Sequence, residues 1–151
     1  MRGLLRIAAA GVTIMIATVT PVLAQQPVPA GHVKTVSGTA TIVREHGTTR
    51  AKPGDPIYAT DTLRTGADGA VGVTLRDDTR VSLGPNSEVL VDRYVYSPGD
   101  GGLGMVLKFM HGVAVYVSGR MAKLAPDAVR LETPSAIVGV RGTTVAIRVG
   151  A

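Results

Sequence analysis

The stretch Asp61–Val89, DTLRTGADGAVGVTLRDDTRVSLGPNSEV, decides the fold of this chain. Apolar residues alternate with small or polar ones over residues 71–75 and again over 81–83. A period of two with β-branched residues is typical of strands that bury one face. Residues 66–69 (GADG) and 84–86 (GPN) have the composition of turns, because Gly, Pro, Asn and Asp adopt or tolerate turn backbone angles. The stretch therefore predicts short strands joined by tight turns.

The same alternation continues on both sides of this stretch. It recurs in segments 33–44, 89–91, 103–109, 113–117, 129–131 and 145–147, with further turn chemistry at 52–56 and 98–102. The best helical window is Met121–Asp127, which Pro126 interrupts. Short strands at a spacing of about 8–12 residues favour an all-β fold. We expect a single compact domain of short antiparallel-type strands forming a sandwich, roll or short solenoid.

The N-terminus predicts export. Arg2 and Arg6 precede an apolar run over residues 7–20, and small or apolar residues over 22–24 follow Pro21. This layout is that of a secretory signal peptide, which we place at 1–24. A retained membrane anchor is the alternative, although a stable span needs about 20 apolar residues.

Beyond the predicted cleavage site, the chain divides into a flexible lead-in at 25–31 and a β domain at 32–151. Cleavage leaves 127 residues, enough for one core, and no stable membrane insertion is expected afterwards. We therefore expect a periplasmic protein. It contains no cysteine, so burial and sheet hydrogen bonds must stabilise it.

The charge pattern argues against nucleic acid as a partner. Cleavage lowers the formal charge from +5 to +3, and the arginines are scattered along the chain. A nucleic-acid surface needs clustered basic residues, often with aromatic stacking platforms. Only Phe109 and four tyrosines supply aromatic rings. We expect no nucleic-acid binding.

Candidate catalytic groups do not form a constellation in the sequence. The three histidines, His32, His46 and His111, are assigned to the lead-in or to turns and lack metal-ligand spacing. Neighbouring side chains on a strand point to opposite faces, so Asp77 and Asp78 are interpreted as a charged hairpin tip. The sequence predicts no catalytic residues, no cofactor and no metal. A histidine–carboxylate site assembled from separate loops remains an alternative.

Arg64 and Arg141 stand beside Gly and Thr at the ends of predicted strands. A buried arginine normally binds carboxylates or carbonyl groups through its five donors. We expect both to staple strand ends, with Asp55, Asp61, Asp68 and Glu88 as candidate partners. A recognition role for Arg141 is the alternative. If Arg141 staples a strand end, Arg141→Ala should lower the free energy of unfolding by about 1–3 kcal/mol.

Four blocks in order carry a family resemblance: Gly54–Ile57, Asp61–Val89, Leu107–Gly112 and TPSAIVGVRGT at Thr133–Thr143. Together they resemble the FecR-type periplasmic domain over residues 32–149, and the last block is the most specific. The family-motif positions, taken as candidate structural or recognition residues, are Gly54, Asp55, Asp61, Arg64, Thr65, Gly66, Ser87, Thr133, Pro134, Val140, Arg141, Gly142 and Thr143.

The resemblance implies an all-β domain with a role in envelope sensing or signalling. In the best-known members, this domain senses an outer-membrane receptor and informs a cytoplasmic tail that controls a sigma factor. Here we expect a stand-alone domain without that tail. The expected function is non-enzymatic contact with an envelope protein whose identity is open. An envelope module that binds a glycan or peptide is the alternative.

Overall fold

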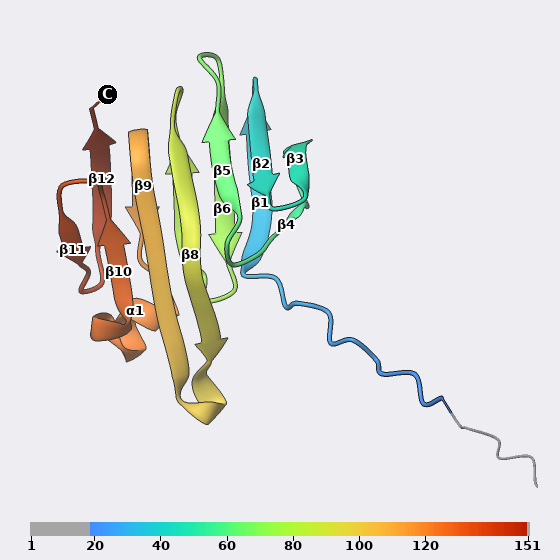
Figure 1. Ribbon diagram of the computed structural model, residues 1–151. Helices are drawn as coiled ribbons and strands as arrows, with labels where there is room; N and C mark the ends of the chain where they lie inside the picture. Colours follow the sequence, from blue (N-terminus) through green and yellow to red (C-terminus); the bar gives the residue numbers. More distant parts are fainter. Residues whose placement is uncertain (1–18, 151) are drawn as a thin grey trace, which may run out of the picture.

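The computed structural model describes residues 19–150, so most of the predicted signal peptide lies outside the described residues. Residues 19–28 are exposed and carry no regular secondary structure (Figure 1). The described chain is almost entirely β-structure. Its strands are β1 Gly31–Ser37, β2 Ala40–Arg44, β3 Gly47–Arg50, β4 Pro56–Ile57, β5 Thr62–Thr65, β6 Ala70–Leu75, β7 Arg80–Leu83, β8 Glu88–Ser97, β9 Gly102–Val117, β10 Val129–Glu132, β11 Ile137–Gly139 and β12 Thr144–Val149.

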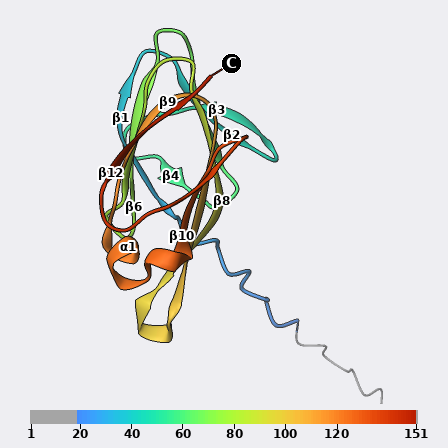
Figure 2. The same ribbon diagram turned by 90° about the vertical axis from the view of Figure 1, so that its left-hand side faces the viewer.

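These strands form one strongly curled sheet, a half-barrel, which confirms the all-β prediction and corresponds to the roll among the expected forms. The order is β3-β2-β5-β8-β9-β7-β6-β1-β4, with β12 and β10 also on β9 and β11 on β10. Figure 2 shows β1, β6 and β12 on one side of the interior and β2, β8 and β10 on the other. All pairs are antiparallel except β9–β10.

Strand β9 joins the two sides of the roll. Its first part pairs with β8, and residues 105–108 pair with β10 in parallel. Its last six residues pair with β12, and four of these also pair with β7. The change falls at Gly112, whose φ is +93°. The sequence pattern predicted two strands with a turn at Met110–Gly112. That prediction was wrong, because the chain bends at Gly112 without leaving the sheet.

The segment 33–44 shows the opposite difference, because it forms two strands. Gly38, with φ +62°, lets the chain turn between β1 and β2. Strand β1 begins at Gly31, and Ala30 is only 2 % exposed. His32 therefore lies in β1, where it pairs with β4 and β6, and not in a flexible lead-in.

The core fills the space inside the roll. Strands β6 and β7 bury every second residue, as the alternation predicted, so Val71, Val73, Leu75, Val81 and Leu83 point inward. The largest fully buried side chains include Tyr116 and Phe109 of β9. A short helix, α1 (Arg120–Leu124), follows β9 and buries Met121 and Ala122. It ends before Pro126, as expected, because Pro cannot continue a helix.

Candidate functional site

The family-motif residues lie in three separate places and do not converge on one site. Gly54 and Asp55 form a turn beside β1, in which the Gly54 N–H donates to the Val33 carbonyl at 2.8 Å. The Asp55 carboxylate accepts the Lys52 N–H at 2.8 Å. A second group lies along β5 and just before the start of β8, and a third forms the C-terminal hairpin described below.

Asp61 is the buried member of a partly buried ion pair. It is 3 % exposed, and its two oxygens accept Arg44 Nε at 3.0 and 3.1 Å. The Tyr58 N–H donates to the same carboxylate, and Arg44 reaches the Pro56 carbonyl at 2.8 Å. The hydrogen bond to Asp61 raises the pKa of Arg44. Arg44 therefore fastens β2 to the segment before β5, although the sequence did not single it out.

Thr65 and Ser87 hold the bend of β9 in place. Thr65 Oγ1 donates to the Gly84 carbonyl at 2.7 Å and accepts the Ser87 N–H at 2.9 Å. Ser87 Oγ in turn accepts the Val113 N–H at 2.9 Å. A Cβ on Gly112 would lie 2.2 Å from Ser87 Oγ. Ser87 Oγ thus bonds to β9 next to the bend, and Thr65 holds Ser87 in place.

Arg64 confirms part of the staple prediction. Its Nε lies 3.0 Å from Glu88 Oε2, one of the candidate partners. His111 Nε2 is 3.3 Å from the same oxygen, and His111 Nδ1 is 2.8 Å from the Asn86 carbonyl. The cluster is half exposed, so its ion pairs contribute little to stability. The structure places His111 inside β9, whereas the sequence pattern suggested a turn.

The burial of Asp77 and its hydrogen bonds were not predicted from the sequence. Asp77 lies at the β6–β7 hairpin tip, as predicted, but it is fully buried. Its carboxylate accepts Thr79 Oγ1 at 2.7 Å, Tyr94 Oη at 3.0 Å and the Met121 N–H at 3.2 Å. Hydrogen bonding therefore replaces solvent for this charge and joins the hairpin to β8 and α1. The neighbouring Asp78 is exposed and pairs with Arg120 at 3.0 Å.

Two buried tyrosines differ in whether their hydroxyl groups are satisfied. Burial and the adjacent Asp77 raise the pKa of Tyr94, whose hydroxyl also accepts the Asp77 N–H at 3.0 Å. Burial likewise raises the pKa of Tyr116, against the opposing effect of the nearby Ser118 and Thr79 hydroxyls. Neither hydroxyl completes a hydrogen bond to Tyr116 Oη among residues 19–150.

We expect Tyr94→Phe to lower the free energy of unfolding by about 1–3 kcal/mol, because it leaves Asp77 with an unmet acceptor. Tyr116→Phe, its matched control, should leave stability unchanged or raise it, because it removes an unsatisfied buried hydroxyl. Urea unfolding followed by circular dichroism measures both. Equal losses in the two variants would contradict this difference.

The third group of motif residues forms the C-terminal hairpin. The Thr133 N–H donates to the Ala136 carbonyl at 2.8 Å, closing a two-residue turn that contains Pro134. Val140 is 2 % exposed and anchors the following loop in the core. Gly142 adopts φ +58°, and the Thr143 N–H donates to Ser118 Oγ at 3.0 Å. The motif thus leads the chain from β11 on one side of the roll to β12 on the other.

Arg141 does not form the predicted staple. Its side chain is exposed, and it makes no hydrogen bond or ion pair with any residue between 19 and 150. The buried neighbour Val140 anchors the loop instead, so Arg141 can point to solvent. The expectation of a stabilising partner is therefore wrong for the described residues, and the recognition role stays a prediction.

Arg141→Ala is accordingly expected to change the free energy of unfolding by less than about 0.5 kcal/mol, as is usual for an exposed side chain. Arg44→Ala, by contrast, should lower it by about 1.5–3 kcal/mol, because the buried Asp61 loses a charged hydrogen-bond donor. Thermal unfolding of both variants tests the contrast. A large loss of stability in Arg141→Ala would instead support the interpretation of Arg141 as a staple.

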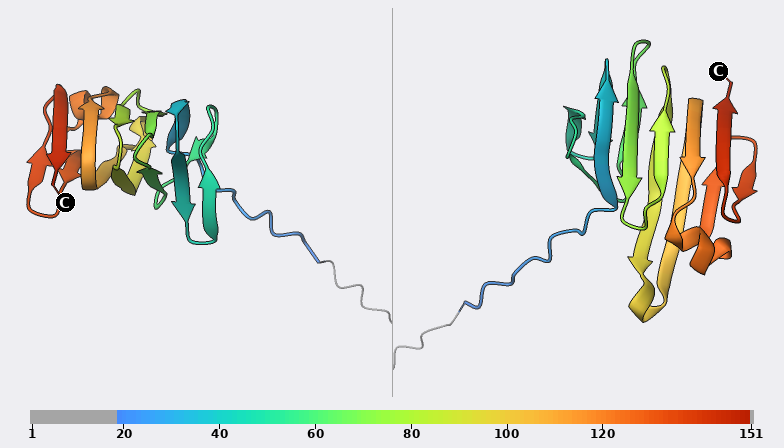
Figure 3. Two further views of the ribbon diagram at one scale, coloured as in Figure 1. Left: turned by 90° about the horizontal axis from the view of Figure 1, so that it is seen from above. Right: turned by 180° about the vertical axis from the view of Figure 1, so that it is seen from behind.

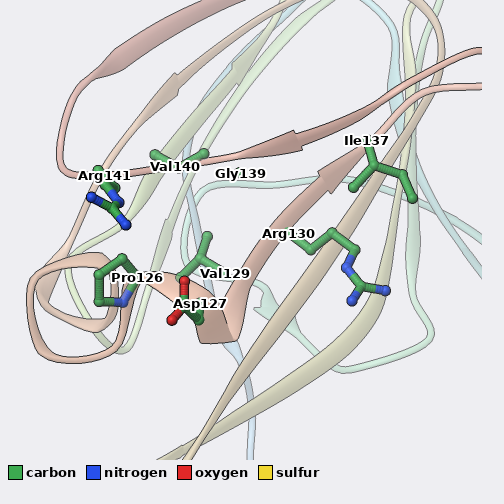
Figure 4. Close-up of a pocket in the computed structure, with 8 residues that line it drawn as sticks. All are labelled: Pro126, Asp127, Val129, Arg130, Ile137, Gly139, Val140 and Arg141. Atoms are coloured by element: carbon green, nitrogen blue, oxygen red, sulfur yellow. The ribbon is translucent and has the colours of Figure 1, made fainter.

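The C-terminal hairpin also borders a shallow pocket. A hollow of about 450 Å³ lies between β10, β11, the loop after β11 and the 3-10 turn Pro126–Ala128. Arg141 and Arg130 lie on opposite sides of it, with Gly139 between them (Figure 4). Figure 3 shows this end of the sheet opposite the end that carries β3.

Residues 19–150 contain no group of three or more His, Asp or Glu side chains arranged to hold a metal ion. Among these residues, no helix is long and apolar enough to cross a membrane. The polar groups that are buried, Asp61, Thr65, Asp77, Thr79 and Ser87, serve the fold through the bonds described above.

The fold and its clusters define a class of protein: a disulfide-free, curled β domain whose buried polar groups fasten strands together. The family model described as FecR protein matches residues 61–151, more than half of the chain. The chain belongs to the FecR family, whose domains are part of envelope signalling systems and are generally non-catalytic. The match begins at Asp61, inside the region 32–149 where the sequence resemblance was seen. No curated protein and no solved structure matched the chain.

Proposed function

We propose that this FecR domain is a non-enzymatic module of the cell envelope that acts through protein–protein contact on the periplasmic side. The observation that carries the proposal is the difference between the buried polar residues, which bond within the fold, and the exposed Arg141 side chain, which forms no bond to residues 19–150. The buried polar residues form hydrogen bonds within the Arg44–Asp61, Thr65–Ser87 and Asp77 clusters. The specific C-terminal motif instead ends in an exposed hairpin and an exposed Arg141.

Site-specific photo-crosslinking in living cells tests this proposal. A photoreactive residue is placed at one exposed position on each face, for example at positions 48, 95 and 137. We expect a discrete crosslinked envelope protein from at least one position. Background labelling from all of them would argue against a protein partner.

The proposal includes export and removal of residues 1–24. Fractionation followed by N-terminal sequencing of the protein tests this part, and we expect a mature chain that begins at Gln25. A chain that keeps Met1 and sediments with the inner membrane would instead support the anchored alternative.

A ligand-binding role is the second candidate, supported by a polar hollow of about 550 Å³. It is lined by His32, Lys34, Arg76 and Asp78, among others. Charged side chains of both signs around a hollow suit a glycan or a peptide more than an apolar ligand. A thermal shift with cell-wall fragments that disappears in Arg76→Ala would favour this function over protein contact.

A further inference from the structure

Within residues 19–150 the curled sheet ends in four strand edges: β3 and β4 at one end, β11 and β12 at the other. Free edges invite pairing with another chain, and proteins usually protect them with charge, proline or short length. Strand β3 is polar and ends in Arg50, β4 is a two-residue strand with Pro56, and β12 contains Arg148. Strand β11, with the sequence Ile-Val-Gly, is also short, but unlike the other three it has neither charge nor proline.

The side chains of β11 add to this lack of protection. Ile137 is 68 % exposed, more than any other large apolar residue between Ala30 and Gly150. Its neighbour Val138 points inward and packs against the core, which holds the strand in place. A Cβ on Gly139 would meet no atom within 4 Å, so the outer face of the strand is open there.

The outward backbone groups of β11 can be assigned from the register. Thr133 and Ala136 form the hydrogen-bonded pair that closes the hairpin. Antiparallel pairs alternate between bonded and non-bonded, so Leu131–Val138 is bonded, whereas Glu132–Ile137 and Arg130–Gly139 are not. The N–H and C=O groups of Ile137 and Gly139 therefore point away from β10, spaced as an incoming strand requires.

Charge around this edge indicates the chemistry of its occupant. Residues 118–150 contain five basic side chains and two acidic ones. Arg120 is paired with Asp78, and Arg130 lies 3.7 Å from Glu132. Arg141 and Arg148 are exposed and have no ion pair within the described residues. An approaching strand with carboxylates would be attracted, and one with lysines would be repelled.

We propose that β11 is a docking strand for an extended segment of an envelope protein in which acidic and apolar residues alternate. The segment adds to the sheet by pairing with Ile137 and Gly139, places an apolar side chain against Ile137, and directs a carboxylate toward Arg141. This mode of recognition takes affinity from main-chain bonds and specificity from alternate side chains. The inference rests on the proposed function, because it names the surface through which that contact is made.

Fluorescence anisotropy with two labelled peptides tests the docking strand directly. The probes are acetyl-TVEVEVT-amide and its lysine counterpart acetyl-TVKVKVT-amide. We expect the acidic peptide to bind the exported domain and the lysine peptide to bind at least about tenfold more weakly. Equal binding of both peptides, or binding of neither, would overturn the proposal.

Two proline variants provide a matched comparison. Gly139→Pro removes an outward N–H from β11 without removing a bond to β10, and it should weaken the acidic peptide about tenfold or more. Thr48→Pro makes the equivalent change on β3, because Thr48 pairs with Val43 at a non-bonded position beside the Arg44–Gly47 turn. It should leave binding unchanged. Edge strands tolerate proline at such positions, so both variants should fold. Equal loss in both would contradict a site on β11.

Charge reversal separates the side-chain part of recognition. Arg141→Glu should weaken the acidic peptide about fivefold and strengthen the lysine peptide. Arg80→Glu, an exposed arginine on β7, is its control and should change neither. A second copy of this chain is the other possible occupant. A dimer in analytical ultracentrifugation that Gly139→Pro dissolves would overturn the assignment to an acidic partner.

The photo-crosslinking experiment distinguishes failure of this inference from failure of the proposed function. A discrete envelope protein captured from position 48 or 95 but not from 137 leaves protein contact intact and removes β11 as its surface. Capture from 137 that Arg141→Glu reduces supports both. Background at every position removes the proposed function itself.

Discussion

Asp77→Ala is expected to lower the free energy of unfolding by about 3–5 kcal/mol. The change removes an acceptor shared by Thr79 Oγ1, Tyr94 Oη and the Met121 N–H, all of which are buried. Each donor left without a partner costs about 1–3 kcal/mol, and bonds to a charged group lie at the upper end of that range. Urea unfolding followed by circular dichroism measures the loss.

Asp78→Asn is the matched control for Asp77, one residue away and of the same type; Asn, unlike Ala, tolerates the φ of +66° at this position. Its side chain is 63 % exposed and its pair with Arg120 is a surface pair. Such pairs contribute about 0–1 kcal/mol, so this variant should unfold at nearly the wild-type urea concentration. Asp77→Asn keeps the volume but turns an amide nitrogen toward donors, so it should remain clearly destabilised. A stable Asp77→Asn would show that the carboxylate is not needed.

Gly112→Ala should destabilise the domain by about 3–4 kcal/mol or prevent folding. The residue has φ +93°, which side chains other than glycine rarely adopt. A Cβ there would also lie 2.5 Å from the Asn86 carbonyl oxygen and from Ser87 Cα, which are backbone atoms held by the neighbouring strand. Both the backbone strain and the overlap oppose the bend of β9.

Gly142→Ala separates these two contributions. Gly142 also has positive φ, at +58°, but a Cβ there meets nothing within 4 Å. Only the conformational cost of about 1–2 kcal/mol remains. Thermal unfolding of the two variants side by side should place Gly112→Ala well below Gly142→Ala. Similar melting temperatures would mean that the atoms around Ser87 can shift to accommodate the added Cβ at little cost.

The Asp77 and Gly112 predictions both concern the contacts that hold the exposed C-terminal strands in position. The Asp77 cluster holds α1 against the β6–β7 hairpin, and the bend at Gly112 directs β9 onto β12. Strand β10, which carries β11, pairs with the other part of β9. Variants that loosen either cluster should therefore weaken binding at β11 only as far as they unfold the domain.

Much of the fold could be predicted from local sequence. The alternation over residues 71–83 set the inward and outward faces of β6 and β7, because side chains alternate across a strand. The turns at 66–69, 84–86 and 98–102 also fall where Gly, Pro and Asn predicted them. Even the short helix before Pro126 was anticipated. Each of these features depends on residues within a few positions of one another.

The candidate site was predicted only in part. Glu88 was among the expected partners of Arg64, and the pair exists. Arg44 was missed as the partner of Asp61, because the two are 17 residues apart and meet only when β2 and β5 pair. Arg141 resembled Arg64 in its local sequence, yet it has no carboxylate beside it. Burial and partners of a charged side chain depend on distant elements that local pattern does not reveal.

By itself, the sequence determined an all-β chain, its turns, and its membership of a recognisable family. The tertiary structure decided that 33–44 breaks into two strands while 102–117 stays one, since glycine permits a turn but only the neighbouring strands determine whether pairing continues through it. It also decided that Asp77 is buried whereas Asp78 is exposed. The reason is that a hairpin tip has two sides, and only packing against β8 and α1 determines which side loses its solvent.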